Sequence, residues 1–233
     1  MSTFGKYCYT NLDTTKPLYI FGAGEFARIA AHYFSEDSPF NIEGFVVDDE
    51  FLENSTYLGF QVLKSSEFYV RFGPSQVNVF VAFSGAQLSI PRLMKVDELK
   101  LAGYTTVSYV SSHTFIDSDT EIGSNVFIFE NNTIQSQVSV GDATVVWSGN
   151  HIGHQTKIGA GCFVSSHVCI GGNTKIANNC YFGMNSTIRD GIIIGTKCVV
   201  GANSYVNKSQ DGNSVIFGIP AKPIRGIDPM DAI

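Results

Sequence analysis

The feature that most constrains the fold is a six-residue period that runs from Val110 to Val206. Every sixth residue in this stretch is apolar, and no insertion breaks the register. The next residue is often Gly, and the fourth residue after the apolar one is usually small, as at Thr144 and Thr156. Neither a helix of 3.6 residues per turn nor a strand of period two gives this pattern. Hexapeptide repeats predict a β-helix, in which each hexad is one short strand and a corner.

Three hexads are expected to close one turn of a triangular prism, so stacked residues lie 18 positions apart. Cys162, Cys180 and Cys198 follow this spacing and all occupy the small position. We expect them to stack inside one edge of the prism at about the 4.8 Å strand spacing, as buried core thiols in preference to a disulfide or a reactive thiol. Cys8 and Cys169 lie outside the column, and the total of five cysteines argues against a complete intramolecular disulfide framework.

The N-terminal half has a different pattern, in which apolar strands alternate with segments of helical period. Strands are predicted at 18–21, 43–47 and 77–83, and helices at 25–34 and 90–104. This alternation predicts a small Rossmann-like α/β domain with a parallel sheet. The predicted organisation is an N-terminal tail at 1–15, the α/β domain at 16–107, the β-helix at 108–208 and a C-terminal tail at 209–233.

A glycine motif follows the first predicted strand. Gly22-Ala23-Gly24-Glu25-Phe26-Ala27 reads G-x-G-x-x-A, which lets backbone N–H groups approach a phosphate at a helix N-terminus. Acidic residues follow the second strand and a serine follows the third, where they can reach ribose, base or sugar. The candidate substrate-binding residues are Gly24, Glu25, Phe26, Asp48, Asp49 and Ser84. The motif alone also suits NAD binding, or a domain that only packs.

Charge and hydropathy exclude other classes of function. The net charge of −6 argues against a nucleic-acid binder that relies on a basic surface. No segment reaches the roughly 18 apolar residues of a membrane span, and the first residues are polar and unlike a signal peptide. We therefore expect a soluble, cytoplasmic protein without membrane insertion.

The ending Gly218-Ile219-Pro220-Ala221-Lys222-Pro223 resembles the G-x-P-A-K closing motif of the hexapeptide acyltransferases. Together with the uninterrupted hexads and the α/β domain carrying Gly-Ala-Gly, the chain resembles the sialic acid O-acetyltransferase and bacillosamine N-acetyltransferase family over about residues 16–225. The resemblance implies a left-handed parallel β-helix and a homotrimer with active sites between subunits. It also implies acetyl-CoA as co-substrate, a nucleotide-linked sugar as acceptor and no metal.

The same resemblance assigns candidate catalytic residues. The family's catalytic His lies four residues before an Ile-Gly pair, which carries the role of general base onto His154; His151 is the competitor. Gln155 follows His154 where the family often has an acid, and Phe163 stands where relatives have a His near the thioester. The candidate acetyl-CoA-binding residues are Phe163, Gly172, Met184, Ala202 and Lys222.

Two further features leave alternatives open. His167, Asn185 and Asn203 form a predicted outward column that suits either a polar ladder or the acyl donor. Trp147 is predicted to point outward, as either a subunit-interface or a ligand-stacking residue. We expect an N-acetyltransferase acting on a nucleotide-linked amino sugar. The alternatives are O-acetylation, a zinc enzyme like the γ-carbonic anhydrases, and a trimeric scaffold without catalysis.

Overall fold

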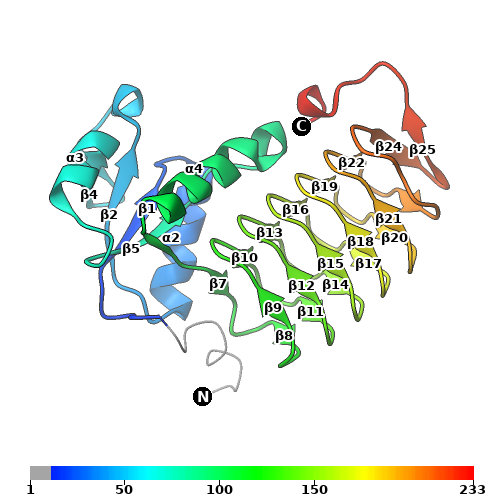
Figure 1. Ribbon diagram of the computed structural model, residues 1–233, viewed down its shortest axis with the longest axis horizontal. Coiled ribbons are helices and arrows are strands. Elements are labelled where there is room, and N and C mark those ends of the chain that lie inside the picture. The colour runs from blue at the N-terminus through cyan, green and yellow to red at the C-terminus, as the bar shows by residue number, and fades with distance from the viewer. Residues whose placement is uncertain (1–11) are drawn as a thin grey trace.

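The computed structural model describes residues 12–233 (Figure 1). Cys8 and most of the predicted N-terminal tail lie outside the described residues. The C-terminal half is a left-handed β-helix, and an α/β unit precedes it, so the predicted fold class is confirmed.

Three sheets form the prism, and all their strands are parallel except the last strand of the first sheet; we call them faces 1, 2 and 3 in chain order. Register fixes their stacking, because Val145 pairs with Phe163 and His151 with Cys169, 18 residues further along. Face 1 contains β7 (Tyr109–Val110), β10 (Phe127–Ile128), β13 (Val145–Val146), β16 (Phe163–Val164), β19 (Tyr181–Phe182), β22 (Val199–Val200) and the hairpin β24 (Val215–Gly218) and β25 (Ala221–Ile224). Face 2 contains β8 (Phe115–Ile116), β11 (Thr133–Ile134), β14 (His151–Ile152), β17 (Cys169–Ile170), β20 (Thr187–Ile188) and β23 (Tyr205–Val206). Face 3 contains β9 (Glu121–Ile122), β12 (Ser139–Val140), β15 (Lys157–Ile158), β18 (Lys175–Ile176) and β21 (Ile193–Ile194).

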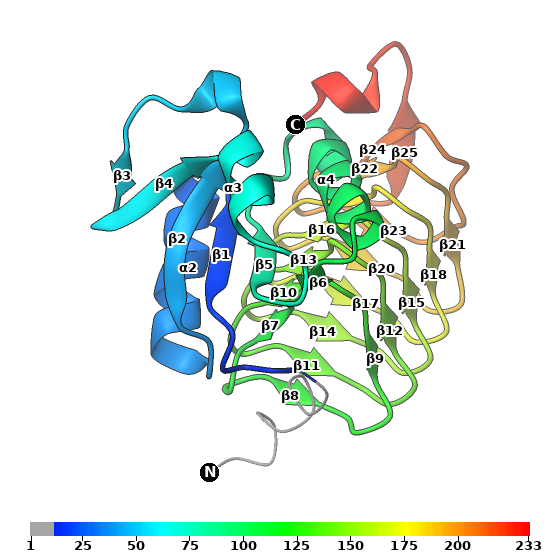
Figure 2. The ribbon, with the colours of Figure 1, turned by 60° about the vertical axis from the view of Figure 1, so that its left-hand side comes forward.

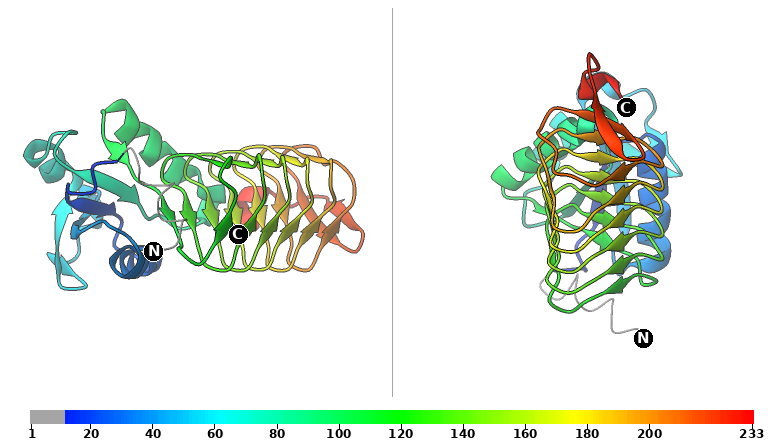
Figure 3. Two further views of the ribbon diagram at one scale, coloured as in Figure 1. Left: turned by 90° about the horizontal axis from the view of Figure 1, so that it is seen from below. Right: turned by 90° about the vertical axis from the view of Figure 1, so that its right-hand side faces the viewer.

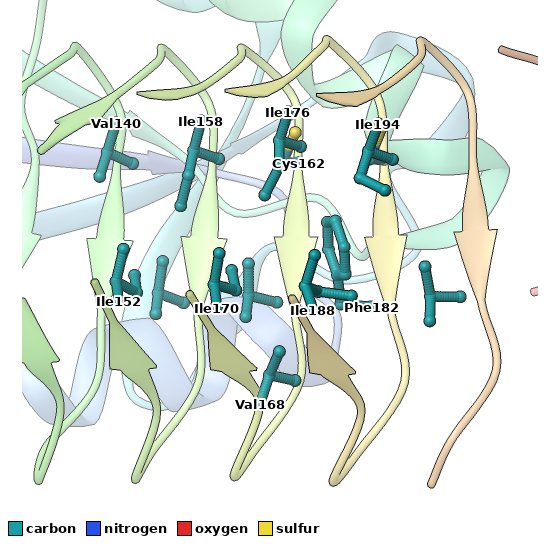
Figure 4. Packing of buried hydrophobic residues seen from close by; sticks show 14 of the residues in the cluster. Val140, Ile152, Ile158, Cys162, Val168, Ile170, Ile176, Phe182, Ile188 and Ile194 are labelled. Atoms are coloured by element: carbon teal, nitrogen blue, oxygen red, sulfur yellow. The ribbon is translucent and has the colours of Figure 1, made fainter. Parts of the chain in front are cut away.

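The predicted apolar positions fill the inside of the prism. Figure 4 shows Ile152, Ile170 and Ile188 side by side on successive coils, and all three belong to the buried core of the prism. Each buried aliphatic side chain contributes roughly 1.5–3 kcal/mol relative to leaving it in water. The repeat therefore stabilises the fold through many similar contributions, none of which dominates.

The predicted cysteine column is confirmed. Cys162, Cys180 and Cys198 are buried and free, and each thiol donates to a backbone carbonyl near the next corner of the same edge, such as Ala177 O at 3.3 Å from Cys162. The Thr144 hydroxyl does the same to Gly159 O at 3.0 Å. The small position thus selects a short side chain that can donate one hydrogen bond inside the corner.

The α/β unit is a three-layer arrangement around one sheet with strand order β3-β4-β2-β1-β5-β6. Helix α2 covers one side of the sheet, and α3 and α4 cover the other (Figure 2). The strands are β1 (Leu18–Phe21), β2 (Ile42–Val47), β3 (Thr56–Tyr57), β4 (Phe60–Lys64), β5 (Asn78–Val81) and β6 (Thr105–Thr106). The helices are α2 (Glu25–Asp37), α3 (Ser65–Arg71) and α4 (Ile90–Leu101), with short 3-10 turns η1 (Asp49–Phe51), η2 (Ala86–Ser89) and, after the prism, η3 (Pro229–Asp231).

Aromatic packing joins the two units. The Phe127 ring on face 1 lies 5.6 Å from the Phe26 ring and 5.9 Å from the Phe34 ring of α2, measured between ring centroids. Polar contacts fix the angle, since Asn125 exchanges two hydrogen bonds with the backbone of Val81. The α/β unit is therefore fixed against the early coils of face 1, at one end of the prism (Figure 3).

Between residues 12 and 233, no helix combines the length and apolarity needed to cross a membrane.

Candidate functional site

A cavity of about 530 Å³ opens at the carboxyl ends of β1, β2 and β5. The turn Gly22–Gly24 and the first turn of α2 form one side of it, as the glycine motif predicts. Gly22 has a φ of +111°, a conformation that favours glycine. Of the predicted substrate-binding residues, five line this cavity: Gly24, Glu25, Phe26, Asp48 and Ser84.

Each of the three predicted carboxylates has a partner within the chain. The Glu25 carboxylate pairs with Arg28 on the exposed first turn of α2. Asp49 does not line the cavity; its carboxylate accepts hydrogen bonds from the Ser66 N–H and hydroxyl and caps α3. The interaction lowers the pKa of Asp49, with the Ser66 hydroxyl as the largest cause.

Asp48 at the cavity forms an ion pair with Lys95 of α4, at 3.1 Å from Nζ to Oδ1. Lys95 also contacts Glu98 at 2.9 Å. Burial alone would lower the pKa of Lys95, but hydrogen bonds to Glu98 and Asp48 outweigh it and raise the pKa. Asp48 is thus held in the wall of the cavity as an oriented hydrogen-bond acceptor.

A second cavity of about 530 Å³ lies over the later coils. We call it the groove. Its floor is face 1, with Phe163, Tyr181 and Val199, and the adjoining edge with Met184 and Ala202. Three of the predicted acetyl-CoA-binding residues therefore line one groove: Phe163, Met184 and Ala202.

The other two predicted acetyl-CoA residues lie elsewhere. Gly172 is at the edge between faces 2 and 3, and Lys222 is exposed on β25, where it pairs with Phe217 of β24. Within one chain, neither belongs to the groove lining.

The backbone from Phe83 to Ser89 separates the two cavities. Ala86 lines both of them, and Gly85 packs so closely on Phe163 that a Cβ there would lie 2.7 Å from the ring. Gln87, Leu88 and Ser89 adopt left-handed φ values of 51°, 54° and 58°. Non-glycine residues hold this conformation only when surrounding contacts impose it.

Two side chains supply those contacts. Fully buried Arg92 donates Nη1–H to Phe83 O at 3.0 Å and Nη2–H to Ser89 Oγ at 2.9 Å, while desolvation lowers its pKa. Asn179 of the prism donates its amide to Leu88 O at 3.0 Å. The loop between the cavities is consequently clamped by both units of the chain.

His154 lies at the edge between faces 2 and 3, after β14 and Gly153. Its side chain is exposed, and its imidazole lies over Gly172: a Cβ on Gly172 would be 2.8 Å from Nε2. The backbone on both sides is fixed, because the His154 N–H donates to Gln135 Oε1 at 2.9 Å and its carbonyl accepts from Asn173 N at 2.8 Å. Two predicted site residues, His154 and Gly172, are therefore in direct contact.

Gln155 has a left-handed backbone, with a φ of 58°, and its side chain donates to Gln137 Oε1 at 2.8 Å. This geometry directs the amide to the preceding coil. Its predicted action on the His154 imidazole stays a prediction.

The outward polar column proves to be a column of corner residues. Asn131, His167, Asn185 and Asn203 all have φ values near 60°, which Asn tolerates better than most residues. His167 lies over Gly149 on the edge between faces 1 and 2, whereas His154 lies on another edge. Within residues 12–233, no cluster of three or more His, Cys, Asp or Glu residues could hold a metal ion.

Trp147 lies outside the prism core, on the outer side of face 1, which agrees with the predicted outward direction. It is half-buried and stacks on Phe129, with ring centroids 4.3 Å apart and planes 8° apart. Its ring also lies 6.3 Å from that of Phe163, and it packs against the apolar cluster between face 1 and α2.

Several lining residues were not predicted. Phe51, Gln87 and Pro91 line the first cavity, and Ala232 and Ile233 line the groove. All lie on irregular segments or on the ends of elements, and no repeat or motif marks them. Among these residues, only Pro91 carries a local sequence signal, because proline is common in the first turn of a helix and so marks the start of α4.

Comparisons place this architecture among solved proteins. Residues 173–208 match the family model of the hexapeptide repeat of succinyl-transferase. No curated protein matches the chain in sequence. Perosamine N-acetyltransferase from Caulobacter crescentus, solved with CoA and GDP-perosamine, is 18% identical with a TM-score of 0.80; the match covers 89% of this chain and 96% of that chain.

Two further structures are similar over their whole lengths. The acetyltransferase domain of PglB from Neisseria gonorrhoeae is 18% identical with a TM-score of 0.79, covering 90% of this chain and 100% of that chain. WeeI from Acinetobacter baumannii is 22% identical with a TM-score of 0.75, with the same coverage. By its repeat and its fold, the chain is a hexapeptide-repeat protein with the two-unit architecture of these acetyltransferase structures.

Proposed function

We propose that the protein is an acetyl-CoA-dependent N-acetyltransferase that acts on a nucleotide-linked amino sugar. The observation that carries the proposal is the pair of adjacent cavities that share Ala86. One begins at a glycine turn and a helix N-terminus, which suit phosphate. The other runs over the later hexads. The similar perosamine enzyme was solved with CoA and a nucleotide-linked amino sugar bound together.

In this proposal the nucleotide occupies the first cavity, with its phosphates against the backbone of Gly24 and the start of α2. Asp48 accepts hydrogen bonds from the ribose or base, and Ser84 contacts the sugar. The acetyl-CoA lies along the groove with Phe163, Met184 and Ala202. The sugar amine then approaches the thioester near Ala86, where the cavities meet.

His154 is the proposed general base. As the amine attacks the thioester carbon, imidazole accepts its proton, the carbonyl oxygen becomes a tetrahedral oxyanion, and the thiolate of CoA leaves as the carbonyl re-forms. The thiolate regains a proton from the imidazolium. No covalent acyl-enzyme is required.

The position of His154 extends the proposal to the assembly. Within one chain, His154 and Gly172 lie on the edge between faces 2 and 3, whereas the groove lies on face 1 and the edge it shares with face 2. A second copy that brings its His154 edge to the groove completes the site. We therefore propose a homotrimer with three equivalent sites between subunits.

The decisive experiment measures CoA release with a panel of nucleotide-linked amino sugars for the wild type, His154→Ala and His151→Ala. We expect His154→Ala to lower kcat by about 10²–10⁴-fold with unchanged thermal unfolding. His151 is exposed on the same coil and should tolerate alanine. Near-wild-type turnover by the His154 variant would sink the assignment of the base. Acetylation of hydroxyl acceptors in preference to amines would instead favour O-acetylation.

A further inference from the structure

The chain does not end at the last coil. After β25 it turns back, and residues 227–233 run along the prism towards α4 (Figures 1 and 3). The Asp228 side chain accepts a hydrogen bond from Met230 N at 2.9 Å and so starts the short turn η3. The returning segment therefore has regular local structure at η3.

The segment packs on the loop that separates the two cavities. Met230 and Ala232 contact a small apolar cluster formed by Leu88, Val199 and Val215. Leu88 belongs to the left-handed loop and is 1% exposed, and Asn179 fixes its carbonyl. The segment is thus attached to the clamped part of the site.

The last residues face the groove. Ala232 and Ile233 line it together with the loop residues Gly85 and Ala86 and the prism residues Tyr181 and Val199. Ile233 remains 36% exposed, so it forms a surface and does not fill the core. The groove lining is predominantly apolar, which suits the uncharged parts of a coenzyme and not its phosphates.

We propose that residues 229–233 form a wall of the acyl-donor groove and bind coenzyme A directly, an inference that rests on the proposed function. The wall supplies apolar contact from Ala232 and Ile233, and Met230 anchors it to Leu88. Its docking also supports the loop that carries Ala86.

Isothermal titration with coenzyme A tests this on the full-length chain. Met230→Asp should release the anchor, and Ile233→Glu should place a negative charge beside an anionic ligand while leaving the apolar cluster intact. We expect each of these two variants to raise the Kd for coenzyme A by roughly tenfold or more. Ile227→Glu is the matched control, because Ile227 is 45% exposed on the same segment but does not line the groove.

The outcomes separate the two proposals. Unchanged affinity for coenzyme A in both test variants would overturn the proposal that residues 229–233 bind it. Tighter binding by Met230→Asp would also overturn it, because the segment would then obstruct the groove. A wild-type chain that binds no coenzyme A would overturn the proposed function itself. Thermal melts of all variants confirm that the prism stays folded.

Discussion

At the scale of single residues, glycines in the corners act in two different ways. A Cβ on Gly153 would meet the backbone of Gly172 in the next coil, so this glycine allows two coils to stack. A Cβ on Gly172 would instead meet the free end of the His154 side chain at 2.8 Å. A Cβ can therefore be added at Gly172 if the His154 side chain moves, whereas a Cβ at Gly153 would force the backbone of the next coil to move.

Gly172→Ala should therefore displace the His154 imidazole without unfolding the prism. We expect kcat to fall by about 10- to 10²-fold, because a misplacement of about 1 Å can cost as much as 10²-fold, with little change in Tm. Gly153→Ala is the contrast and should lower Tm by several degrees, because backbone must move. Steady-state kinetics and thermal melts of both variants check this pair. Full activity in Gly172→Ala would contradict the contact as a positioning device.

The hexad register predicted which residues stack but not what each side chain contacts. It placed Cys162 next to Cys180, and the structure shows that the same spacing of 18 brings His154 over Gly172. The same spacing places Gln155 next to Gln137, but it could not show that the two side chains form a hydrogen bond. The spacing of 18 gives the position of each residue on the prism, but it does not give the conformation of its side chain.

At the scale of elements, the loop from Phe83 to Ser89 is the least regular part of the site and the most constrained. Three consecutive left-handed residues cost roughly 1–2 kcal/mol each. Arg92 and Asn179 offset that cost from opposite sides, one from α4 and one from the prism. The loop therefore depends on both units being in place.

Asn179→Ala removes the amide that binds Leu88 O and leaves a buried carbonyl unpaired. We expect a loss of about 1–3 kcal/mol in the free energy of unfolding, and weaker binding of both nucleotide and coenzyme A, because Ala86 lines both cavities. Asn131→Ala is the control, since Asn131 has the same left-handed backbone but is exposed on an early coil. Denaturant unfolding and titration measure the two effects. Equal losses in both variants would show that only corner strain had been changed.

Sequence periodicity predicted the elements of this chain unevenly. Strand β1 and the start of α2 agree with the prediction, and α4 ends at Leu101, just before Gly103 with its φ of 87°. The strands β3 and β4 and the helix α3 were not predicted, because each is short and carries few apolar positions. The left-handed loop has no local signature, since tertiary contacts impose it.

At the scale of the whole molecule, the candidate residues divide between two edges of one prism. His154 and Gly172 differ by 18 positions, as do Met184 and Ala202, but the two pairs belong to different columns. The proposed base and the groove therefore lie on different columns, and His154 does not line the groove. Two copies must meet if the proposed reaction is to occur.

Mixing two inactive variants tests that requirement. His154→Ala removes the base, and Ala202→Trp fills the groove; each homotrimer should be inactive. In trimers assembled at random from equal amounts, a site works only if the groove variant supplies His154 and the His154 variant supplies the groove. About a quarter of the sites meet both conditions, so roughly a quarter of wild-type activity should return. A site contained within one chain would restore none, because every chain in the mixture carries one of the two defects.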